Sequence, residues 1–262
     1  MIKFFRKIRQ GLLREGKTAQ YAKYALGEIV LVVVGILIAL NINNWNEATH
    51  DRNREIKYLN SLRADLTHDL INLERISNTA HRKTVFAVKI MALEPPKNQR
   101  ELFILDSMLL RVSVWNTFKQ RASTIDELTS SGNLSLIKND SIKSLMLSIK
   151  QRNVFLKTID NHIREEFDKF IYPTVAEDYE EFAFFNMQKL AENDTIVWEK
   201  SIEEQRVPVL LKKAETLLKN EVFQNGLRLA AVNFKGARIN YEPMITETKK
   251  LISLIDEELK EK

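Results

Sequence analysis

The chain contains no cysteine among its 262 residues. It therefore has no disulfide bond, no thiol nucleophile and no thiolate metal site. Any domain that it forms must be stabilised by a core of buried apolar side chains, and the chain is long enough to build such a core.

Glycine and proline are also scarce, with 7 and 5 residues respectively. Beyond residue 45 the only glycines are Gly132, Gly226 and Gly236. A β-rich domain needs many turns, and turns draw heavily on these two residue types. Their scarcity, together with apolar residues spaced three and four apart, predicts an all-α fold. We expect a single N-terminal transmembrane helix that continues into an elongated helical bundle.

Recognisable catalytic motifs are missing as well. The chain has no P-loop and no dinucleotide-binding fingerprint, and it has no G-x-S-x-G nucleophile turn. The pairs Glu47/His50 and Asp65/His68 resemble the carboxylate-x-x-His motifs of di-iron bundles. On one helix, however, they would stand about 27 Å apart and could not share a metal. We expect no enzymatic activity, no cofactor and no metal, and a hydrolase using an unrecognised acid pair is the least favoured alternative.

One long apolar run is present, at residues 24–42 (YALGEIVLVVVGILIALNI). As a helix, about 20 such residues cross the hydrocarbon layer of a bilayer, which is roughly 30 Å thick. Tyr21 and Tyr24 stand at one end and Trp45 at the other, where aromatic rings favour the membrane interface. A cleaved signal peptide is the alternative, but the run ends in NINNWN without a small-residue cleavage site. We therefore expect an uncleaved anchor in the lipid bilayer.

Basic residues are concentrated before this run. Residues 1–23 carry seven Lys and Arg residues against one acid, Glu15. Such residues stay in the cytoplasm during insertion, so the N-terminus is expected inside and the rest outside. The predicted division is a basic amphipathic cytoplasmic segment (1–23), a transmembrane helix (24–45) and a periplasmic α-helical domain (46–262) of a bacterial inner-membrane protein. Residues 1–17 fit either a helix lying in the headgroup layer or an unstructured basic tail.

The remaining charge is balanced. The chain has 40 basic and 35 acidic residues, so setting aside those seven basic residues with Glu15 and Glu28 leaves 33 of each. A nucleic-acid-binding domain needs a basic face on its folded part. The sequence therefore predicts no nucleic-acid partner.

One face of the predicted span carries small and polar residues: Glu28, Gly35, Ala39 and Asn43. Small residues four apart let helix backbones approach closely in lipid, which favours association. The face therefore predicts a homo-oligomer or a single-span membrane partner. Two plainer readings stay open: such pairs occur by chance, and Glu28 can reach the cytoplasmic headgroups.

The domain divides at its few helix breakers. A first helix carries a leucine-rich seam with a period near 3.5 residues, which is typical of a coiled coil. The seam consists of Leu59, Leu62, Leu66, Leu70, Leu73, Ser77 and Ala80. Gly132 fits the position after a helix end where φ is positive. Expected helices cover residues 45–93, 98–130, 140 to just before Pro173, 207–241 and 243–258, with one or two short helices in 174–206. Pro243 either starts a helix or kinks one, and Trp198 and the Phe-rich stretch 182–185 indicate core or groove lining.

Two stretches carry a resemblance to a known family: GEIVLVVVGILIALNINNWNE at 27–47 and TIDELTSSGNLSLI at 124–137. With them, the chain resembles an uncharacterised family of single-span envelope proteins common in Bacteroidota, known only as a domain of unknown function. The resemblance implies a membrane protein and brings no activity or catalytic residue.

Two functions follow as hypotheses. The first is a membrane-anchored periplasmic helical scaffold or interaction module. The second is a ligand-sensing periplasmic domain. Since the cytoplasmic segment of about 23 residues is shorter than a domain of about 50 residues, such a sensor would signal through a separate membrane partner.

Overall fold

The computed structural model describes residues 18–114, 116–193, 197–199 and 201–260. The amphipathic segment predicted at 1–17 lies outside these residues. The chain forms two units, 1–57 and 58–262, which are taken in turn. The described secondary structure is helical apart from one isolated bridge between Phe185 and Trp198, so the all-α fold is confirmed.

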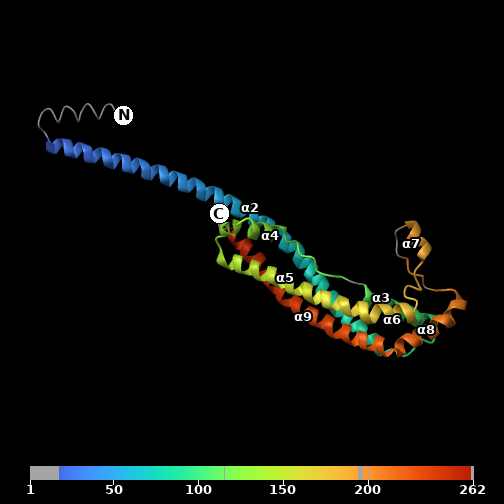
Figure 1. The fold of residues 1–262 in the computed structure, drawn as a ribbon. Helices are drawn as coiled ribbons and strands as arrows, with labels where there is room; N and C mark the ends of the chain where they lie inside the picture. Colours follow the sequence, from blue (N-terminus) through green and yellow to red (C-terminus); the bar gives the residue numbers. More distant parts are fainter. Residues whose placement is uncertain (1–17, 115, 194–196, 200, 261–262) are drawn as a thin grey trace. The chain divides into compact units, whose positions relative to one another are not determined.

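The first unit contains the start of helix α2 (Thr18–Met91), drawn in blue in Figure 1. Its apolar side chains are exposed; Ile29, for example, is 62% exposed and Leu37 55%. Among the described residues, α2 is the one helix long and apolar enough to cross a membrane. A lipid environment would bury these side chains, which is what a span requires.

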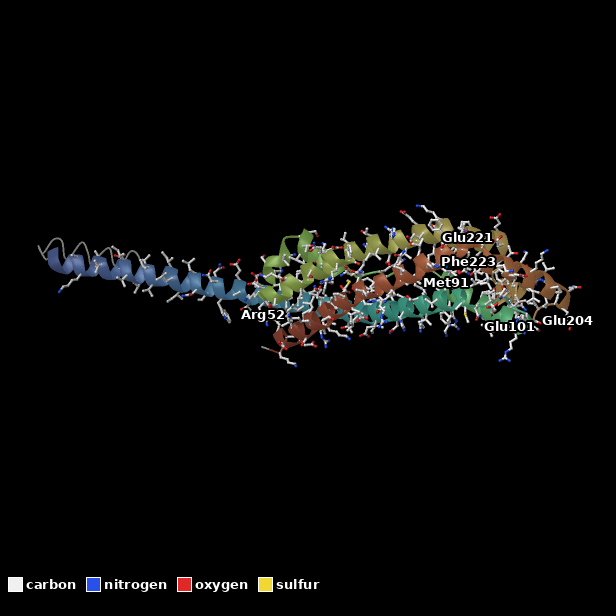
Figure 2. All side chains as sticks on the ribbon, turned by 90° about the horizontal axis from the view of Figure 1, so that it is seen from below. Arg52, Met91, Glu101, Glu204, Glu221 and Phe223 are labelled. Carbon is white, nitrogen blue, oxygen red and sulfur yellow. The ribbon has the colours of Figure 1, made fainter. Side chains whose placement is uncertain are left out.

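The second unit is built from the rest of α2 and a set of helices. These are α3 (Gln99–Ser113), α4 (Ser123–Ser130), α5 (Asp140–Glu166), α6 (Tyr172–Asp178), α7 (Met187–Asn193), α8 (Val207–Lys219) and α9 (Glu221–Glu258). Single turns η1 (Asn133–Leu136), η2 (Phe167–Ile171) and η3 (Glu204–Arg206) connect them. Helices α5 and α9 lie side by side, while α3, α6 and α8 gather at one end of this unit (Figure 1). Met91, which ends α2, and Glu101 in the first turn of α3 are labelled in Figure 2.

The leucine seam of α2 is confirmed as a buried face. Leu59, Leu62 and Leu73 are fully buried and Leu66 is 1% exposed. The seam belongs to a core that includes α5 and α9 of the same chain. Because its own chain covers it, the seam is not a coiled-coil surface for a second copy.

Two buried charged residues of α2 explain a helix break that the sequence prediction missed. Residues 98–130 were expected to form one helix, but α3 ends at Ser113 and α4 begins at Ser123. The Lys83 ammonium donates a hydrogen bond to the Val114 carbonyl. The Asp69 carboxylate accepts from the Arg121 amide at 3.0 and 3.2 Å. These bonds tie the backbone at Val114 and at Arg121 to α2, a tertiary contact that local propensity could not reveal.

The boundary predicted at Pro173 was also revised, whereas Pro243 follows one of the two predicted alternatives, a proline inside a continuous helix. The helix expected to stop before Pro173 continues through the π-helical turn η2, and Pro173 lies at the start of α6, directly after that turn. Pro243 lies inside the single helix α9. The break falls instead at Asn220, whose side chain accepts from the amides of Val222 and Phe223 and caps α9. Figure 2 labels Phe223 in this first turn. Gly132 has φ +75°, as predicted.

Candidate functional site

An open pocket of about 710 Å³ lies between α2 and α3 in the second unit. Helix α2 contributes the most side chains to its lining. Others come from α3, and Trp198 comes from the segment that follows α7. The lining residues are Arg75, Thr79, Arg82, Lys83, Phe86, Phe103, Ser107, Leu110, Arg111, Val114, Asn116 and Trp198. A cavity of this size falls within the range of small-molecule sites. We call it the α2/α3 pocket.

Four cationic side chains and no acidic ones line the α2/α3 pocket. Seven arginines elsewhere in the described residues form ion pairs with carboxylates. No described carboxylate forms an ion pair with Arg75, Arg82 or Arg111. Arg82 donates to the Thr79 hydroxyl at 3.2 Å, and the Arg111 guanidinium lies 5.4 Å from the Phe86 ring centre. The pocket therefore holds three guanidinium groups whose charge no ion pair with a described carboxylate neutralises.

Lys83 lies at the base of this pocket and is 4% exposed. Its ammonium donates to the Val114 carbonyl and lies 4.8 Å from the centre of the Phe234 ring. Burial lowers the pKa of Lys83 to about 8, because the charged form loses hydration. The side chain is still mostly protonated at neutral pH, so it adds to the positive charge of the pocket.

Aromatic side chains form the other part of the lining. Trp198 packs edge-on against Phe103 and Phe185, with ring centres 5.6 and 4.5 Å apart. Its backbone is held by a short two-stranded contact. In that contact Asn186 N donates to the Val197 carbonyl at 2.9 Å, and Glu199 N donates to the Phe184 carbonyl at 2.7 Å. The interpretation of Trp198 as groove lining is therefore confirmed.

A second, smaller cavity of about 20 Å³ adjoins the pocket and shares Thr79, Lys83 and Asn116 with it. Asp160 lines this cavity and accepts a hydrogen bond from the Tyr241 hydroxyl at 2.9 Å. Burial raises the pKa of Asp160 to about 6 despite that bond. Asp160 is thus a buried, hydrogen-bonded carboxyl that lines the smaller cavity and not the α2/α3 pocket itself.

A buried carboxyl also supports the segment that carries the aromatic lining. Asp106 on α3 is 1% exposed and accepts from the Phe182 amide at 3.2 Å. Phe182 has φ +68°, a conformation that non-glycine residues rarely adopt. Burial is the main cause that raises the pKa of Asp106 to about 7; the negative charges of Glu181 and Glu180 act in the same direction, and backbone hydrogen bonds act against it. The other carboxyl oxygen of Asp106 has no hydrogen-bond partner among the described residues.

The residues predicted for the membrane lie in the first unit. Gly35, Ala39 and Asn43 are exposed on α2, and a Cβ added at Gly35 would meet nothing within 4 Å. Glu28 is partly exposed. Trp45 is 73% exposed, whereas the side chains of Tyr21 and Tyr24 lie outside the described part of the structure. The association face and the interface residues stay predictions.

Sequence reasoning missed the α2/α3 pocket. A signal was present in α2, where Arg75, Thr79, Arg82 and Phe86 recur at spacings of three and four residues, next to the leucine seam. The contributions of Arg111 and Trp198 come from distant parts of the chain and required the fold. In the described residues, no group of three or more His, Asp or Glu side chains is placed to hold a metal ion.

Comparison with known proteins gives one finding. A family model described as a family of unknown function (DUF6090) matches residues 28–210. The matched range includes every residue that lines the α2/α3 pocket. No curated protein and no solved structure matches the chain. Because the match covers more than half of its length, the chain belongs to this family of unknown function, DUF6090.

Proposed function

We propose that this protein is a membrane-anchored helical module of the bacterial envelope that binds an anionic ligand in the α2/α3 pocket. The apolar part of α2 anchors it, with the N-terminus in the cytoplasm. Residues 46–262 face the periplasm. Binding without chemical conversion is the proposed role, which makes the protein a ligand-sensing module acting through a separate membrane partner.

One observation carries the binding function: three arginines without carboxylate partners, and one buried lysine, line a single hollow. Guanidinium groups present paired donors that match carboxylate and phosphate oxygens. Clustering them raises the local concentration of anions. Holding like charges together costs free energy in the empty pocket, and an anion would offset that cost.

A thermal-shift experiment tests this function. The full-length protein in mild detergent should melt at a higher temperature in phosphate or sulfate than in chloride at the same ionic strength, because a ligand stabilises the state that binds it. Arg82→Gln should reduce the shift. Arg228→Gln is the matched control, since Arg228 also lacks an ion pair in the described residues, is exposed, and donates a hydrogen bond to the Asn225 side chain on α9 at 2.7 Å. Equal shifts for both variants would overturn the proposal.

The orientation has its own test. A reporter fused after Lys262 should behave as periplasmic, because the basic residues precede the span. Activity of a reporter that works only in the cytoplasm would contradict this orientation.

A scaffold or interaction role is the second candidate, supported by the open small-residue face of the span at Gly35 and Ala39. Gly35→Ile adds bulk there without making the span less apolar, so it should weaken association of the span. Val33→Ile, on another face, should not. A membrane dimerisation reporter measures both variants, and equal association of the two with the original would refute this role for the face.

A further inference from the structure

We propose that the ligand of the α2/α3 pocket is a phosphate monoester that carries an aromatic or apolar body. This inference rests on the proposed anion-binding function and goes further by naming the chemical class. It follows from the division of the lining into a cationic part and an aromatic part.

The cationic part is better matched to a phosphate monoester than to a single carboxylate. Arg75, Arg82, Arg111 and Lys83 all line the hollow. A carboxylate carries one negative charge and two oxygens, which one guanidinium fork can satisfy. A phosphate monoester carries a charge of about −1.5 to −2 near pH 7 and three terminal oxygens. Three forks and an ammonium therefore suit the larger charge and the larger number of acceptors.

Neutral hydrogen-bonding groups complete this part of the lining. Thr79, Ser107 and Asn116 add hydroxyl and amide groups beside the cations. The Asn116 amide can donate to a phosphate oxygen without adding charge, whereas the Thr79 and Ser107 hydroxyls already donate to the Arg75 and Ile104 carbonyls. Arg82 is already oriented by its bond to the Thr79 hydroxyl at 3.2 Å.

The aromatic part and the size of the pocket call for more than a phosphate group. A cavity of about 710 Å³ is much larger than an inorganic anion needs, and five aromatic or apolar side chains also line it: Phe86, Phe103, Leu110, Val114 and Trp198. Stacking a flat ring on an aromatic side chain contributes about 1–3 kcal/mol in nucleic-acid-binding proteins. Because Arg111 lies over the Phe86 ring at 5.4 Å, the cationic and aromatic parts meet, so one ligand can contact both.

This chemistry has two possible sources: a soluble aryl phosphate, or a lipid whose head group is a phosphate monoester. The probes are inorganic phosphate, phenyl phosphate and benzoate, titrated calorimetrically into the full-length protein in phosphatidylcholine nanodiscs. We expect phenyl phosphate to bind about tenfold more tightly than inorganic phosphate, since tenfold corresponds to about 1.4 kcal/mol. Benzoate should bind more weakly than phenyl phosphate.

Variants separate the two parts of the pocket. Arg82→Gln should weaken both phosphate and phenyl phosphate. Trp198→Leu should remove most of the preference for phenyl phosphate and leave the affinity for inorganic phosphate unchanged. If the loop of the Leu variant fails to fold, Trp198→Phe is the second variant, and it should keep part of that preference. Repeating the titration in nanodiscs that contain phosphatidate identifies the source: competition indicates a lipid, and undisturbed binding indicates a soluble ester.

The outcomes distinguish this inference from the proposed function. If no anion binds, both are overturned. If inorganic phosphate and phenyl phosphate bind equally in the original protein, or benzoate binds as tightly as phenyl phosphate, the anion-binding function stands and the ligand class is wrong.

Discussion

Replacing Asp106 by asparagine should stabilise the protein more at pH 8 than at pH 5. The Asp106 carboxyl is 1% exposed, one of its oxygens accepts from the Phe182 amide, and the other has no partner among the described residues. The titratable groups near it are Glu180, Glu181 and Tyr179. None of these three is a cation, so none of them favours the charged form of the carboxyl. Asparagine keeps an acceptor oxygen for the Phe182 amide and carries no charge.

The size of the effect follows from the two pKa values of the carboxyl. Burial raises the pKa of Asp106 from its ordinary 3.8 to about 7. In the folded state the carboxyl thus holds its proton up to about pH 7, whereas in the unfolded state it loses the proton near pH 4. Between these values the folded state binds more protons, so this group makes the protein less stable as pH rises. At about 1.4 kcal/mol per pH unit the whole cost is on the order of 4 kcal/mol, of which about 3 kcal/mol accumulates above pH 5.

Urea unfolding of both proteins, followed by circular dichroism from pH 5 to pH 8, measures this difference. The free energy of unfolding of Asp106→Asn minus that of the original should rise by about 3 kcal/mol up to pH 7 and then level off. Asp160, whose pKa burial also raises, remains in both proteins and cancels in the difference, whereas Glu181 is repelled by a charged Asp106 and its response is part of the measured effect. A difference that does not change with pH would mean that Asp106 is hydrated or paired, and the reasoning would be refuted.

Two further predictions concern packing and are measured as thermal and urea stability. Leu66→Asp, at a site 1% exposed, should cost about 3–5 kcal/mol because a charge is buried without a partner; Ile71→Asp, at a site 63% exposed, should change stability by about 0.5 kcal/mol or less. Similar effects at the two sites would contradict the burial of the seam. Gly236→Ala should stabilise α9 by about 0.5–1 kcal/mol, since its Cβ meets nothing within 4 Å. Gly226→Ala should instead destabilise by about 1–3 kcal/mol, because its Cβ would lie 2.8 Å from an Ile171 side-chain atom and 3.0 Å from another side chain. The same sign for both glycines would mean that α9 and η2 pack differently.

The all-α fold and the buried seam could be predicted because both depend on local periodicity. The seam residues from Leu59 to Ala80 recur at a helical spacing. That spacing indicates a buried face, whether the helices that cover it belong to the same chain or to another. The same pattern does not say whether the partner is another chain; here α5 and α9 of the same chain complete the core, and the coiled coil stays a prediction.

The helix ends and the pocket could not be predicted for the same physical reason. The break after Ser113 depends on hydrogen bonds from Lys83 and Asp69, which belong to a different helix. Pro243 remains inside α9. The helix break falls at Asn220 instead, where the Asn220 side chain caps α9, although a proline is the stronger helix-breaking signal in the sequence. The pocket likewise requires Arg111 and Trp198 to meet α2, a contact that only tertiary packing creates.

The location of a bound anion tests the anion-binding function most directly. Crystals of the protein soaked in tungstate, which scatters X-rays strongly and resembles phosphate in shape, would reveal where an anion binds. The proposal predicts the strongest anomalous peak in the α2/α3 pocket, within contact of the guanidinium groups of Arg75, Arg82 and Arg111, and its loss in Arg82→Gln. A pocket without a peak, with tungstate bound at other basic sites, would contradict it.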